Sequence, residues 1–85
     1  MATNQETHRP IYKIAKEIQQ IWSKQGRGVN YAAKPYLDAM RSLNSIDQDY
    51  GADDARSIVR YFLSNASSFK GEDARRLKAE LKAML

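Results

Sequence analysis

The stretch that decides the fold is residues 11–22, IYKIAKEIQQIW, in which apolar residues recur at helical spacing. At 100° per residue, its apolar side chains fall within an arc of about 120°, and lysine, glutamate and glutamine cover the opposite face. The pattern predicts an amphipathic helix with one face in a protein core. Pro10 suits its first position, since the missing N–H of proline would have no partner there, and Gly26 and Gly28 end the helix.

Three further segments show the same spacing. The second helix is expected over roughly Tyr31 to Leu43, with Asn30 as its N-cap. The third is expected to start with Asp53 as cap and Asp54 in the first turn, where a carboxylate suits the helix dipole. The fourth is expected to open at residues 71–73 and to run to the C-terminus. The core faces of these helices are Ala33, Tyr36, Leu37, Met40 and Leu43; Ala55, Ile58, Val59, Phe62, Leu63 and Ala66; and Ala74, Leu77, Leu81, Met84 and Leu85.

Between the second and third helices lies a loop, residues 44–53, rich in turn-forming residues. Ile46 and Tyr50 are expected to hold this loop on the core. No segment shows the alternation typical of a strand. The sequence therefore predicts an all-α protein, a compact bundle of three or four short amphipathic helices.

Length and composition limit the function classes. We expect a flexible N-terminal tail, residues 1–8, and a single helical domain, residues 9–85. The absence of cysteine excludes disulfides and thiol chemistry. We expect no signal peptide and no membrane segment, because no apolar stretch is long enough. A cytoplasmic location is expected, and the net charge of +4 favours acidic partners.

Candidate sites for chemistry are few. Four aspartates in residues 47–54 suggest a calcium loop, but an EF-hand would need glycine and glutamate where Ala52 and Ile58 stand. The Gly26-Arg27-Gly28 segment resembles a fragment of a phosphate loop and lacks the rest of that motif, so we interpret it as an inter-helix turn. His8 has no partnered nucleophile nearby in the sequence. We therefore expect no catalytic residue, no metal site, no cofactor and no enzymatic activity.

Basic and aromatic residues of the last two helices form the candidate partner-binding site. Such a surface suits phosphates or an acidic protein face. The alternative is a solvated surface with local ion pairs, such as Arg76 with Glu80 four residues later. Tyr61 is included because tyrosines at the edge of an apolar stripe can anchor an interface. The candidates are Arg56, Arg60, Tyr61, Arg75, Lys78 and Lys82.

A DNA-reading helix-turn-helix is disfavoured. The break between the last two helices is longer than the usual turn of 3–4 residues. A recognition helix presents its N-terminal residues to the bases, and here that end carries Glu72 and Asp73, which phosphates would repel.

The segment YGADDARSIVRYFLSNASSFKGEDARRLKAELKAM, residues 50–84, resembles a family of small, uncharacterised helical proteins of bacteriophages and mobile elements. The similarity extends to residue 10 through Ile11-Tyr12, Ile14-Ala15, Glu17-Ile18 and Pro35-Tyr36-Leu37. It implies a phage protein acting inside a bacterial host. Small phage proteins without catalytic motifs commonly block host machinery, as anti-CRISPR and other anti-defence inhibitors do.

The sequence thus favours a small, phage-type, non-enzymatic protein-binding module, including an anti-CRISPR-like inhibitor of a host or defence-system protein. One alternative is a nucleic-acid-binding accessory protein or transcription regulator. Another is a structural phage protein that self-assembles as a homo-oligomer.

Overall fold

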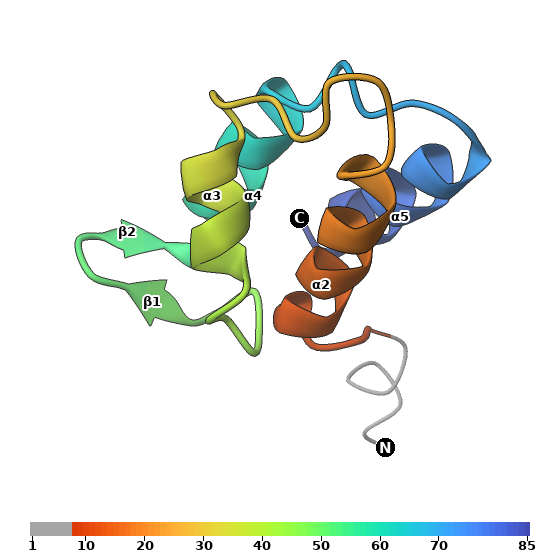
Figure 1. Ribbon diagram of the computed structural model, residues 1–85. Coiled ribbons are helices and arrows are strands. Elements are labelled where there is room, and N and C mark those ends of the chain that lie inside the picture. Colours follow the sequence, from red (N-terminus) through yellow and green to blue (C-terminus); the bar gives the residue numbers. More distant parts are fainter. Residues whose placement is uncertain (1–7) are drawn as a thin grey trace.

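The structure is a computed structural model that describes residues 8–85. This part of the chain contains four helices and one small antiparallel hairpin (Figure 1). The predicted flexible tail lies outside the described residues except for His8, which is exposed. In chain order the elements are α2 (Ile11–Trp22), α3 (Lys34–Met40), β1 (Asp49–Tyr50), β2 (Asp53–Asp54), α4 (Ala55–Ser64) and α5 (Glu72–Met84).

The helices pack as two neighbouring pairs. Figure 1 shows α2 beside α5 and α3 beside α4, and α2 also packs against α3. The order of contact is therefore α4, α3, α2, α5, around a shared core. The radius of gyration is 12.3 Å, close to the roughly 12 Å expected for a compact chain of this length. The predicted mainly helical, compact bundle is confirmed.

The predicted apolar faces form this core almost completely. All but four of the predicted core residues are buried. Ile21, Tyr36 and Leu63 are half-buried at its margin, and Leu85 is exposed. Because these faces repeat every three or four residues, burying them together is what stabilises helices that would be marginal alone.

Residues outside the helix explain where α2 begins and where it ends. The first amide N–H groups of a helix have no partner within it. In α2 those of Ile11 and Tyr12 donate to Asn44 O at 3.2 Å and Leu43 O at 2.8 Å. The helix ends at Trp22, before the two glycines.

The second helix is shorter than predicted. Asn30 does not cap an α-helix; its Oδ1 accepts a hydrogen bond from Ala32 N at 3.1 Å within a separate turn. Pro35 then lies in the first turn of α3, where its missing N–H costs nothing. This position fixes the later start of the helix.

Two expectations for residues 44–54 are wrong. The segment is not strand-free, since Asp49 pairs with Asp54 and Tyr50 with Asp53 in a hairpin. Two-residue strands are too short to produce an alternating pattern. Tyr50 is 45% exposed on this hairpin and does not hold the loop on the core, whereas Ile46 does pack against it.

The cap of α4 is Asp54 and not Asp53. Its Oδ1 accepts a hydrogen bond from Ser57 N at 2.8 Å. That bond is the largest cause of a lowered pKa for the Asp54 carboxyl, and the nearby Arg56 and Arg60 act in the same direction. Asp53 is taken up by the hairpin, so the helix starts one residue later than predicted.

A core residue absent from the predicted faces lies between α4 and α5. Phe69 is fully buried, and its ring stacks on Trp22 with centroids 5.2 Å apart and an interplanar angle of 24°. Trp22 also meets Phe62 edge-on at 6.1 Å. The connection after α4 therefore contributes to the core as a helix does.

Candidate functional site: the basic face of α4 and α5

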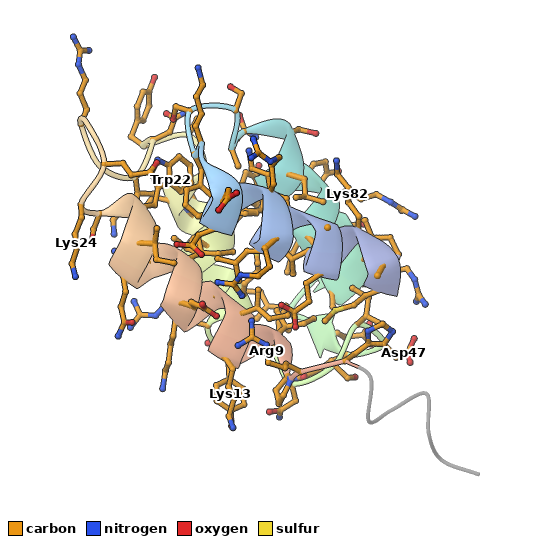
Figure 2. The ribbon with its side chains drawn as sticks, turned by 90° about the vertical axis from the view of Figure 1, so that its right-hand side faces the viewer. Arg9, Lys13, Trp22, Lys24, Asp47 and Lys82 are labelled. Carbon is orange, nitrogen blue, oxygen red and sulfur yellow. The ribbon has the colours of Figure 1, made fainter. Side chains whose placement is uncertain are left out.

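The sides of α4 and α5 that meet their neighbours can be assigned from side-chain contacts. On α4, the ring of Tyr61 lies 5.4 Å from that of Tyr36 on α3. On α5, Glu80 receives two hydrogen bonds of 2.8 Å from Arg9, which precedes α2 (Figure 2). One flank of each helix therefore contacts another part of the chain.

The other flanks carry the predicted cations. At about 100° per residue, Arg56 and Arg60 fall about 140° and 100° from Tyr61 around α4, across the exposed side of the helix. By the same geometry, Arg75, Lys78 and Lys82 fall on the side of α5 opposite Glu80. Figure 2 shows Lys82 on the side of α5 away from α2, toward α4.

Two contacts bring one end of each helix close to the other. Arg56, near the start of α4, pairs with Asp47 at 3.1 Å. Asp47 in turn lines a hollow of about 480 Å³ together with Met84, near the end of α5. The start of α4 and the end of α5 therefore both lie near Asp47. We call the cationic flanks of α4 and α5 together the α4–α5 basic face; it consists of Arg56, Arg60, Arg75, Lys78 and Lys82.

Tyr61 is separated from the other candidates. Its side chain is about half exposed, but it lies on the flank that faces α3. Five of the six predicted site residues thus lie on the free flanks of α4 and α5, and the sixth lies beside Tyr36.

The five cations differ in how free they are. Arg56 is engaged by Asp47. Lys78 Nζ donates to Phe69 O at 2.7 Å and lies 5.8 Å from the centre of the Phe69 ring, so Lys78 also supports the fold. The remaining three cations are exposed and form no ion pair with residues 8–85; they are Arg60, Arg75 and Lys82.

The pKa of the Lys78 ammonium group reflects the positive charges around it. Partial burial is the main cause of a lowered pKa for its ammonium group, and the charges of Lys82 and Lys70 add to it. Both effects disfavour the protonated form. An anion that docked here would relieve the repulsion between these groups.

The opposite flank of α5 is neutralised by a network that local sequence reasoning did not find. Arg9 bridges Glu80 and Glu17, and Arg76 binds Glu17 at 2.7 Å and Asp73 at 3.2 Å. The hydrogen bond from Arg76 is the largest cause of a lowered pKa at Glu17, and that from Arg9 at Glu80. The expected pair of Arg76 with Glu80 is wrong, because Arg9 holds Glu80.

Neither metal-binding nor membrane-spanning features stand out among residues 8–85. No group of three or more histidine, aspartate or glutamate side chains in this range is placed to hold a metal ion. No helix in it has the length and hydropathy to cross a bilayer. The acidic residues of the hairpin region serve instead as strand, cap and ion-pair partner.

Comparisons with protein-family models, with curated proteins and with solved structures give no match for this chain. The α4–α5 basic face therefore has to be interpreted from its own geometry.

Proposed function

We propose that this protein is a non-enzymatic protein-binding module that docks its α4–α5 basic face on an acidic surface of a partner protein. The observation that carries the proposal is the set of five cations on the free flanks of α4 and α5, where Asp47 is the only carboxylate among residues 8–85 paired to them. Electrostatic complementarity of this kind speeds association and selects partners. The phage-like sequence pattern favours a host or defence-system protein as the partner, and inhibition as the outcome.

The arrangement of the face supports a protein partner over nucleic acid. Glu72 and Asp73 stand in the first turn of α5, next to Arg75, and would repel a phosphate backbone. The tyrosine that could stack on a base lies on the other flank of α4. A protein surface can place single carboxylates between such charges, which a continuous phosphate chain cannot.

Affinity capture with matched variants tests the proposal. The tagged wild-type protein, Arg60→Glu and Lys13→Glu are each used to capture partners from bacterial lysate, with quantification by mass spectrometry. Lys13 is exposed on α2 (Figure 2), so its reversal changes the net charge equally at another surface. We expect one protein to be retained by the wild type and Lys13→Glu and lost by Arg60→Glu.

Two outcomes would count against this function. Equal loss in both variants would indicate nonspecific charge attraction. Binding of a DNA or RNA duplex at about 50 mM salt that weakens steeply with added salt would instead favour the nucleic-acid alternative, because neutralised phosphates release counterions.

A further inference from the structure

A second hollow lies on another part of the molecule, between the turn that follows α2 and the connection between α4 and α5. Its volume is about 370 Å³, and its walls include Trp22, Arg27 and Ser68. This volume is at the lower end of the range for small-ligand pockets. Among residues 8–85, none of those that line it is acidic.

Side-chain amides hold the two walls together. Gln25 Nε2 donates to Lys70 O at 2.8 Å, and Gln25 Oε1 accepts from Lys70 N at 3.3 Å. Asn30 Nδ2 donates to Asn65 O at 3.3 Å, and its Oδ1 is occupied by Ala32 N. Both amide groups therefore join the turn after α2 to the connection between α4 and α5 through backbone hydrogen bonds.

Among residues 8–85, several of the groups left without partners at this hollow are hydrogen-bond donors. Trp22 is 1% exposed, and its indole N–H takes part in none of the side-chain hydrogen bonds among residues 8–85. The only sealed side-chain nitrogen or oxygen without a partner in this range is Gln19 Oε1. The indole nitrogen is not among these sealed atoms, and Trp22 lines this hollow.

The backbone of the turn adds to this set. Gly26 and Gly28 adopt positive φ angles of 39° and 80°, a conformation that glycine tolerates without strain. Within residues 8–85, the amide groups of Gly26 and Arg27 donate no backbone hydrogen bond. Arg27 also supplies a guanidinium group, which outweighs the negative partial charge at the C-terminal end of α2.

We propose that this hollow binds a small oxyanion, a carboxylate or a phosphate group, through Trp22 Nε1, the Arg27 guanidinium and the Ser68 hydroxyl. A buried indole N–H normally finds an acceptor, and an oxyanion would supply it. Charge-assisted hydrogen bonds from Arg27 would provide most of the affinity. The site is separate from the α4–α5 basic face, so it stands or falls independently of the proposed function.

The single tryptophan makes the test specific, because the indole N–H gives one resonance in a ¹⁵N correlation spectrum. The full chain is titrated with sodium phosphate and, separately, with sodium acetate, at constant ionic strength maintained with sodium chloride. We expect a saturable shift of the indole resonance with at least one of the two anions. A response to phosphate alone identifies a phosphate site, and a response to acetate alone a carboxylate site.

Matched variants decide whether the binding occurs in this hollow. Arg27→Ala should weaken it about tenfold, the effect of losing one charge-assisted contact. Lys24→Ala removes the same charge from an exposed neighbour that does not line the hollow, and should change the dissociation constant less than twofold. The proposal is overturned if neither anion shifts the resonance, if chloride shifts it equally, or if Lys24→Ala weakens binding as much as Arg27→Ala.

Discussion

Replacing Phe69 by alanine tests whether the connection between α4 and α5 belongs to the core. The ring is fully buried and stacks on Trp22. Truncating a buried phenylalanine to alanine costs about 3–5 kcal/mol, from lost transfer energy and the cavity left behind. A domain of this length has a total stability of about 4–13 kcal/mol, so the change is a large part of it.

The assay is urea unfolding followed by circular dichroism and by Trp22 fluorescence. Tyr31→Ala is the matched control, because Tyr31 is 87% exposed and its loss should cost less than about 0.5 kcal/mol. If Phe69→Ala does not fold, Phe69→Leu should still show a loss of about 1–2 kcal/mol, because it keeps some apolar area but loses the ring stack. A cost below about 1 kcal/mol for Phe69→Ala, or one equal to that of Tyr31→Ala, would refute the packing described here.

Three further predictions concern the ion-pair network and the start of α4. In double-mutant cycles, the coupling energy of Arg9 with Glu80 should be about 1 kcal/mol, a value already reduced for the partial exposure of Arg9. The coupling energy of Arg76 with Glu80 should be undetectable. The reverse result would support the pairing of Arg76 with Glu80 that the sequence suggested. Asp54→Ala should lower the thermal midpoint because it removes the N-cap, while Asp53→Ala should leave it nearly unchanged; equal effects would contradict the assigned cap. Folding lowers the pKa of Glu80 from its ordinary 4.5, so the unfolded chain binds that proton more readily than the folded chain. The stability that this group contributes is therefore present above about pH 4.5 and is lost as the pH falls. Glu80→Gln should lose less stability than the wild type between about pH 5 and pH 3, and parallel pH profiles of the two proteins would exclude this contribution.

Most of the fold could be predicted from the helical periodicity of apolar residues. The repeat of apolar residues in residues 11–22 depends only on helix geometry, and Ile11, Ile14 and Ile18 are all buried as expected. Phe69 was missed because it is a single apolar residue in an aperiodic connection, where no spacing indicates burial. The hairpin was missed because two residues per strand cannot alternate.

The candidate site was predictable only within each helix. The spacing of Arg75, Lys78 and Lys82 places them on one flank of α5 from sequence alone. That Tyr61 lies beside Tyr36 follows from the position of α3, which the sequence alone does not reveal. The pairing of Arg9 with Glu80 spans 71 residues, so no local rule indicates it.

The most direct test of the α4–α5 basic face is the affinity of the captured partner for two double charge reversals. Arg60→Glu with Arg75→Glu alters this face, and Lys13→Glu with Lys24→Glu makes the same change in net charge on α2 and the turn after it (Figure 2). The dissociation constant is measured by calorimetry at about 150 mM salt. The first pair of reversals should weaken binding at least about 100-fold, and the second pair should weaken it less than about threefold. Equal weakening by both pairs, or unchanged binding by the first, would contradict the assignment of this face as the partner-binding surface.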